Sequence, residues 1–254
     1  MWDYCGHSLE VARLRGATYA DVRVMHHRQR DLTTKSGRVG TLEQSESIGL
    51  GIRVVASGAW GFASTDQLTR DGVAVCAAQA VAIARSSALA KKENVRLAPE
   101  GTYIDSWQGP CGKDPFALPL ESQLDLLLAV DAAMRQVKGV TLSETDMQFR
   151  KIDTWFASSG GSQIHQRRVI SGCGIVATAF QGGEIQKRSY PNSFGGQHVL
   201  GGYELIEAME LLRHAPRVAE EAVALHSAPQ CPEKTGTLIL CGSQLGLQIH
   251  ESVG

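Results

Sequence analysis

The period of the hydrophobic pattern changes once near residue 69, and this change constrains the fold most strongly. Apolar and polar residues alternate over 20–24 before it, and strands are predicted there and over 38–46, 47–56 and 59–63. Ser57 and Gly58 lie between the last two strands as a hairpin signal. From 69 to 90 the apolar spacing becomes helical, with Thr69 or Asp71 able to cap the start. A meander followed by a helix predicts an α+β fold.

The rest of the chain predicts a second region of the same class. Four of the eight prolines fall between residues 94 and 119, which we expect to be a linker. It separates an N-terminal α+β domain, 1–93, from a central, mostly antiparallel α+β domain, 120–254. The other expected elements are helices over 9–16, 120–138, 203–225 and 244–253, several strands between 140 and 198, and a short buried strand over 237–240.

Charge and cysteine content exclude several classes of protein. Twenty-five basic and 26 acidic residues give a net charge of −1, so we expect no nucleic-acid partner and no membrane partner. The N-terminal residues lack the basic start and apolar core of a secretory signal. The six cysteines form no Cys-x-x-Cys pair, which argues against a disulfide scaffold. A cytoplasmic protein is the expectation.

Two residues near the C-terminal end are candidates for metal binding and catalysis. His250 and Glu251 are adjacent on the helix expected over 244–253, and zinc peptidases use such a pair as metal ligand and general base. With 8 histidines in 254 residues, chance alone supplies about 0.5 His-Glu pairs, so a structural histidine is the alternative. The usual motif has a second histidine four residues on, where this chain has Gly254.

Several longer runs of sequence make the prediction of a zinc peptidase more specific. They are Tyr19-Ala-Asp-Val-Arg23, Glu46-Ser-Ile-Gly-Leu-Gly-Ile-Arg-Val54, Gly58-Ala-Trp-Gly-Phe-Ala-Ser-Thr65 and His250-Glu-x-x-Gly254. Over nearly its whole length the chain resembles the TldD/PmbA proteins, known as modulators of DNA gyrase and understood as metallopeptidases. The motif of that family is His-Glu-x-x-x-His. Its second histidine corresponds to position 255, and its third ligand is a cysteine further downstream.

The resemblance implies a function and a set of roles. His250 would be the first zinc ligand and Glu251 the general base of a zinc-dependent peptidase that hydrolyses unfolded peptides. It also implies a homodimer, or a heterodimer with a family partner that lacks the metal. These 254 residues would be a fragment that ends inside the metal-motif helix and is inactive alone. The alternative is a non-catalytic subunit of such a dimer that binds peptides or a partner.

The glycines and aromatic residues between 49 and 62 have structural interpretations. Gly49 and Gly51 form a Gly-x-Gly, but no third glycine completes a phosphate loop, so close backbone packing or hairpin geometry is expected here and at Gly61. Trp60 and Phe62 are expected in the core. The same face of an edge strand could alternatively bind an extended peptide.

Overall fold

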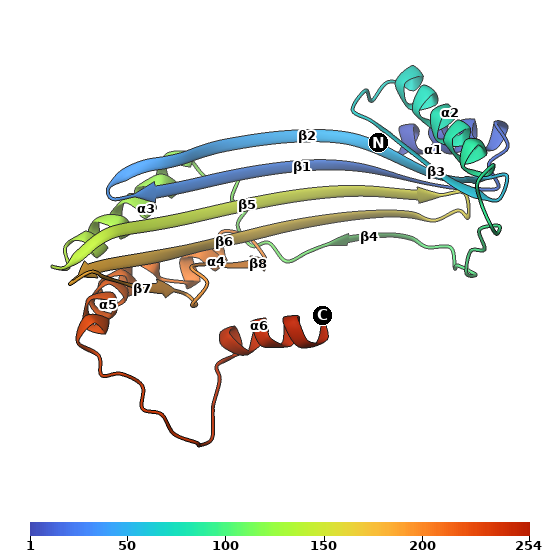
Figure 1. Ribbon diagram of the computed structural model, residues 1–254. Helices are drawn as coiled ribbons and strands as arrows, with labels where there is room; N and C mark the ends of the chain where they lie inside the picture. The colour runs from blue at the N-terminus through green and yellow to red at the C-terminus, as the bar shows by residue number, and fades with distance from the viewer. The chain divides into compact units, whose positions relative to one another are not determined.

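The computed structural model describes residues 1–254 and confirms the α+β class (Figure 1). None of its helices has the length and apolar character needed to cross a membrane. The helices are α1 (Trp2–Leu14), α2 (Arg70–Ser87), α3 (Leu120–Arg135), α4 (Glu204–Ala208), α5 (Leu211–Ala224), the short 3-10 helix η1 (Leu225–Ser227) and α6 (Gly242–Val253). The strands are β1 (Tyr19–Lys35), β2 (Arg38–Ala56), β3 (Ala59–Thr65), β4 (Ile104–Gln108), β5 (Val140–Ser158), β6 (Gln163–Gln181), β7 (Glu184–Tyr190) and β8 (Gln197–Leu200).

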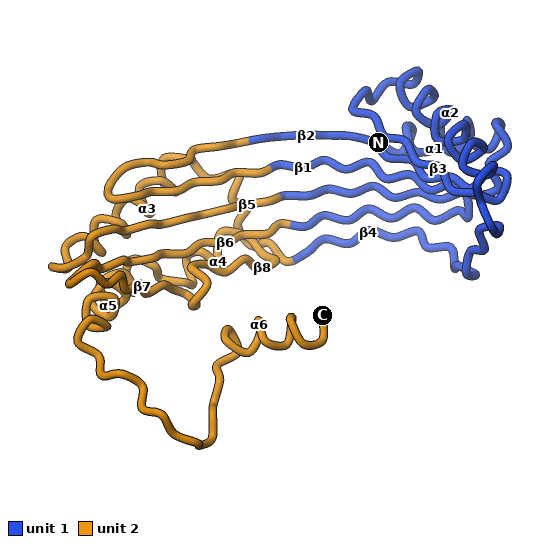
Figure 2. The backbone as a smooth tube through the Cα atoms, in the orientation of Figure 1, with its two compact units in different colours: residues 1–28, 45–109, 151–168 blue, residues 29–44, 110–150, 169–254 orange.

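The chain forms two compact units, and neither is a continuous segment (Figure 2). Unit 1 comprises residues 1–28, 45–109 and 151–168, and unit 2 comprises 29–44, 110–150 and 169–254. Strands β1, β2, β5 and β6 are 17 to 19 residues long, so each supplies residues to both units. The ranges 1–93 and 120–254, expected as domains, therefore each contribute to both units.

Unit 1 consists of one sheet with two helices on one of its faces. The strand order is β3-β2-β1-β5-β6-β4, with β2 and β3 antiparallel and β4 parallel to β6. Thr69 caps the N-terminus of α2, and its hydroxyl accepts a hydrogen bond from the Gly72 N–H at 3.0 Å. Alternate strand residues and one stripe of α2 are fully buried together, namely Val22, Val24, Ile52, Val54, Val73, Ala77 and Ala80.

Gly61 is required where α2 packs on β3. A Cβ at this position would collide with the backbone oxygen of Ala80 and lie 2.5 Å from the backbone nitrogen of Ala84. The expectation of close backbone packing is therefore confirmed for this glycine. The absence of its side chain lets the helix approach the edge strand.

Unit 2 has a core of its own, in which α3, α5 and the strands meet. Strands β7 and β8 both pair antiparallel with β6. The buried carboxylate of Asp131 on α3 accepts hydrogen bonds from the Thr34 and Ser143 hydroxyls, both at 3.0 Å, and from the Gly37 N–H at 2.9 Å. The apolar core comprises Leu32, Leu127, Met134, Met147, Phe149, Ile175, Ile206 and Val218, among others.

The structure corrects three local predictions. Residues 38–46 and 47–56 form one strand, β2, because the pairing of neighbouring strands continues through a stretch that is exposed and carries no apolar alternation. The helix expected over 203–225 is broken into α4 and α5 at Glu210, which has a φ of 44°. Residues 237–240 form no strand, and Leu238 and Ile239 are exposed, since this apolar run has no neighbouring strand with which to pair.

The segment 94–119 also contains more structure than a linker. Residues 104–108 form β4, which pairs in parallel register with β6 from Ile104 opposite Gln163 to Gln108 opposite Arg167. All five residues of β4 are exposed. Backbone hydrogen bonds therefore hold this strand, and its sequence carries no hydrophobic alternation that would have revealed it.

Candidate metal-binding residues and an open groove

His250 and Glu251 lie in the last turns of α6, as the sequence predicts for a helix. No residue of α6 is buried, and both side chains are exposed. Nowhere in residues 1–254 do three His, Cys, Asp or Glu side chains lie together in a group that could hold a metal ion. The structure thus places the two residues side by side on a helix and brings no further ligand to them.

A second candidate site lies on the open face of the unit 1 sheet, opposite α1 and α2. It is a groove of about 760 Å³, within the range of small-molecule binding sites. Four strands of unit 1 supply its walls. The lining includes Asp21, Arg23, Met25, Ser47, Gly51, Arg53, Phe62, Asp66 and Ile152.

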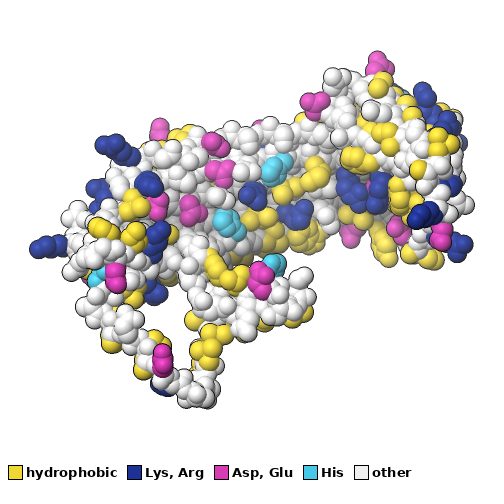
Figure 3. All heavy atoms as spheres, in the orientation of Figure 1, with side chains coloured by type: hydrophobic (Ala, Val, Ile, Leu, Met, Phe, Trp, Pro, Cys, Tyr) yellow, Lys and Arg dark blue, Asp and Glu magenta, His cyan; other side chains and the backbone are white.

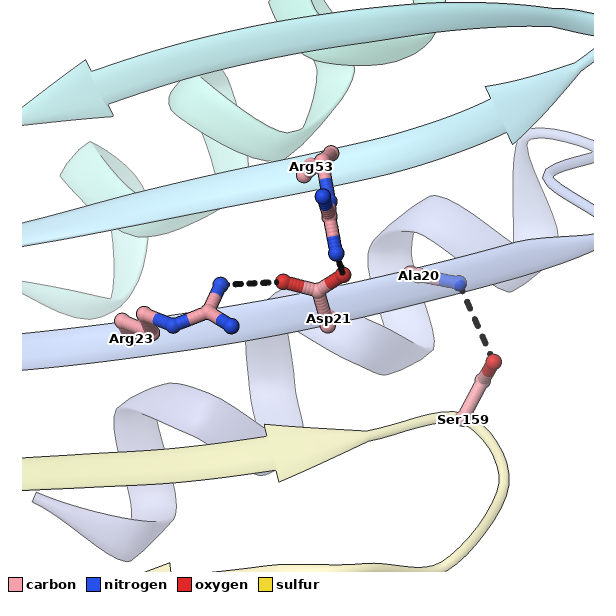
Figure 4. A network of polar contacts seen from close by, with 5 residues as sticks. All are labelled: Ala20, Asp21, Arg23, Arg53 and Ser159. Carbon is pink, nitrogen blue, oxygen red and sulfur yellow. Dashed lines mark hydrogen bonds and ion pairs between the residues drawn. The ribbon is translucent and has the colours of Figure 1, made fainter. Parts of the chain in front are cut away.

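An ion-pair network forms one end of this groove (Figure 4). Asp21 is 1% exposed, and its Oδ1 accepts a hydrogen bond from Arg23 Nη1 at 2.7 Å. Its Oδ2 accepts two from Arg53, from Nε at 2.9 Å and from Nη2 at 2.7 Å. Both arginine side chains remain about half exposed. Two guanidinium groups therefore share one carboxylate, and the network keeps an excess positive charge.

Aromatic rings hold the two guanidinium groups in place. Arg23 lies over the ring of Phe156 at 4.8 Å, and Arg53 lies over the ring of Trp60 at 4.7 Å. These are cation–π distances. Burial lowers the pKa of Arg53, but the hydrogen bond and charge of Asp21 outweigh it and raise the pKa overall. Arg53 is therefore charged at every physiological pH.

The core placement expected for Phe62 was wrong, because 58% of its surface is exposed beside the groove. Sequence reasoning did not single out Asp21, Arg23 and Arg53 as functional. The available signal was their position: Asp21 and Arg23 alternate with Val22 and Val24 along β1, so they share the face that the valines do not use. An aspartate and arginines at such positions can form a network on the open face.

Comparisons with known proteins identify the family. Residues 20–84 match PmbA/TldA metallopeptidase domain 1, and residues 113–227 match the PmbA/TldA metallopeptidase central domain. A metalloprotease from Methanothermobacter thermautotrophicus is 27% identical over 254 residues, which is 99% of this chain and 53% of that protein. A metalloprotease from Methanocaldococcus jannaschii is 23% identical over 93% of this chain and 51% of its own length. The chain spans about half the length of these relatives.

Solved structures share the fold. A structure described as a modulator of DNA gyrase, from Thermotoga maritima, gives a TM-score of 0.68 at 15% identity, over 91% of this chain and 50% of that one. TldE from Thermococcus kodakarensis gives a TM-score of 0.59 at 12% identity, over 87% and 46%. Together the two matched domains cover more than half of the sequence, and so the chain belongs to the PmbA/TldD metallopeptidase family.

Proposed function

We propose that this chain supplies His250 as a zinc ligand and Glu251 as the general base of a peptidase that hydrolyses unfolded peptides. The observation that carries the proposal is the placement of the two residues next to each other on the exposed helix α6, in a chain of a metallopeptidase family. Both curated relatives named above are metalloproteases, which supports the same reaction class.

The residues described here do not complete a zinc site. A catalytic zinc ion takes three protein ligands, commonly imidazole or carboxylate groups, and α6 offers one imidazole beside one carboxylate. We therefore propose that the other ligands come from residues outside this sequence. The half-length match to the relatives supports this, because their other half is available to supply them.

We further propose that the peptidase works as a dimer, either with itself or with a family member that lacks the metal. The alternative function is a non-catalytic subunit that binds peptides or a partner within such a dimer. The groove of unit 1 favours a peptide-binding role under either proposal, because it combines exposed apolar walls with charged groups.

Metal analysis of the 254-residue chain tests the ligand assignment. Purified chain incubated with zinc and then desalted is expected to retain far less than one zinc per chain by inductively coupled plasma analysis. It is also expected to cleave no casein. Retention of one zinc per chain that is lost on His250→Ala would contradict the proposal that further ligands lie outside these residues.

A further inference from the structure

The structure assigns to the groove of unit 1 a binding site for the C-terminal carboxylate of an extended, apolar peptide. The site is built from Asp21, Arg23 and Arg53 at one end and from the apolar walls beside them. It involves neither His250 nor Glu251, and its test needs no catalysis. The inference therefore stands or falls separately from the proposed peptidase function.

The charge of the network favours an anion. Arg23 directs only Nη1 to Asp21, so its Nε and Nη2 N–H groups remain available to a second carboxylate. Asp21 is buried and already accepts hydrogen bonds from both arginines, so it holds the guanidinium groups in position rather than satisfying them fully. Guanidinium groups fixed in this way recognise planar carboxylates through charge-assisted hydrogen bonds.

One further carboxylate lines the groove, and it lies away from the arginines. Asp66 follows Thr65 at the end of β3, whereas Phe62 pairs with Arg53. Asp66 lies four positions after Phe62, which corresponds to about 13 Å along an extended chain. At that distance, across a solvent-open groove, most of the charge of Asp66 is screened from the arginine end.

The apolar walls of the groove indicate which side chains the bound peptide carries next to its carboxylate. Phe62 and Met25 are 58% and 43% exposed, and both line the groove with Ile152. The space-filling view shows basic side chains lying among hydrophobic ones on this side of the molecule (Figure 3). Apolar surface beside a fixed cation favours a carboxylate that carries an apolar side chain.

The length of the groove favours a peptide over a single amino acid. Its lining on β2 runs from Ser47 to Arg53, which spans about 20 Å at the rise of a strand. Gly49 and Gly51 lie within this stretch, and a Cβ at Gly51 would come within 3.1 Å of the Phe62 ring. The missing side chain keeps the groove open between its ends. An extended peptide of about six residues fits this length.

Binding of matched peptides to the 254-residue chain tests the inference without metal. The probe is a hexapeptide that ends in Phe-Leu, labelled with a dye at its N-terminus, as the free acid and as the C-terminal amide. Fluorescence anisotropy at about 0.1 M salt is expected to give a Kd about 10-fold lower for the acid than for the amide. Equal Kd values for the two peptides would overturn the assignment. So would the absence of binding of either peptide at a concentration of about 1 mM, which corresponds to a weak affinity.

Two variants locate the effect. Arg23→Gln leaves Asp21 paired with Arg53 and is expected to reduce the preference for the acid to less than about 3-fold. Phe62→Ala should raise the Kd of the acid and of the amide by the same factor, so the preference for the acid should remain. Arg213→Gln, at a 73% exposed arginine of unit 2, is the matched control and should change nothing. An undiminished preference in Arg23→Gln, or no weakening in Phe62→Ala, would contradict the site.

A competitor separates a peptide from a small carboxylic acid. N-acetyl-leucine carries the same carboxylate and side chain but lacks the preceding residues. It is expected to displace the labelled acid only at concentrations at least about 10-fold above those of the unlabelled hexapeptide. Equal potency would overturn the assignment of a peptide as the ligand.

Discussion

Arg53 donates two hydrogen bonds to a single oxygen of Asp21, from Nε at 2.9 Å and from Nη2 at 2.7 Å, and leaves the other oxygen to Arg23. This arrangement connects β1 with its neighbour β2 on the open face of the unit 1 sheet. Burying a carboxylate there is tolerable only because two cations pair with it. The pair thus stabilises the sheet and also fixes the charged end of the groove.

Removal of the carboxylate of Asp131 should destabilise unit 2. This fully buried group accepts hydrogen bonds from Thr34, Gly37, Arg135 and Ser143, which Asp131→Ala would leave without their acceptor. We expect a loss of about 3 kcal/mol in the free energy of unfolding, measured by urea denaturation. Asp125→Ala, at an exposed position on the same helix, should change it by less than about 0.5 kcal/mol. Equal effects of the two variants would contradict this role of the network.

A side chain at position 61 should push α2 away from β3. Gly61→Ala places a methyl group against the backbone of Ala80 and Ala84, which cannot yield without a shift of the helix. We expect a loss of roughly 2–3 kcal/mol, seen as a lower melting temperature by circular dichroism. Gly6→Ala in α1 is the control: its Cβ meets nothing within 4 Å, so stability should stay the same or rise. A Gly61→Ala chain as stable as the wild type would show that the helix has room to move.

Glu204 should make unit 2 more stable at neutral pH than in acid. Burial alone would raise the pKa of this carboxyl, but the N–H groups of Gly112, Lys113 and Gly202 outweigh it and lower the pKa to about 2. The folded pKa is below the unfolded one, so the stabilisation is complete above about pH 4.5 and is lost as the pH falls toward 2.

Glu204→Gln tests this pH dependence. At pH 7 the variant should lose about 1–2 kcal/mol of unfolding free energy, and the difference from wild type should shrink as the pH falls below 4. Glu207 lies on the same helix, α4, and forms an exposed ion pair with Lys113. Glu207→Gln removes this pair and should lower the free energy of unfolding by less than about 1 kcal/mol. A Glu204→Gln deficit that stays constant from pH 7 to pH 3 would argue against the carboxylate as its origin.

Asp146 should make the chain less stable at neutral pH than in weak acid. Burial raises its pKa to about 6, above the ordinary value of 3.8, so the folded state binds more protons between these values. Stability should therefore fall as the pH rises from about 4 to 7. Asp146→Asn keeps the shape without the charge and should stabilise the chain at pH 7.5 by on the order of 2 kcal/mol, with little effect at pH 4. A destabilised Asn variant at pH 7.5 would mean that the charged form is the favoured one.

The predictable part of this fold is the part whose side chains repeat with a regular period. The valines of β1, the apolar stripe of α2 and the leucines of α3 all gave elements that the structure contains. Strand β4 is exposed and depends on backbone pairing with β6, which is distant in the sequence. The N-terminal half of β2 is also exposed and lies beside β1 in the sheet. The pairing of β4 leaves no trace in the local sequence, and the sequence does not show that 38–46 and 47–56 are one strand.

The site was predictable to a different extent in its two parts. His250 and Glu251 are adjacent in sequence, so a motif could reveal them together with their helix. Asp21 and Arg53 lie 32 residues apart and meet only because β1 and β2 are neighbours in the sheet. Each residue alone resembles an ordinary polar position on a strand, and only the strand order makes them a network.

We propose that His250 binds the metal and that Glu251 acts as the general base. The most direct test uses protein made from the full coding sequence of its gene, with zinc content and casein cleavage measured for wild type, His250→Ala and Glu251→Gln. We expect one zinc per chain and activity in the wild type, loss of both in His250→Ala, and retained zinc with activity reduced at least about 100-fold in Glu251→Gln. A wild-type protein without zinc, or a His250→Ala protein that keeps zinc and cleaves casein, would contradict it.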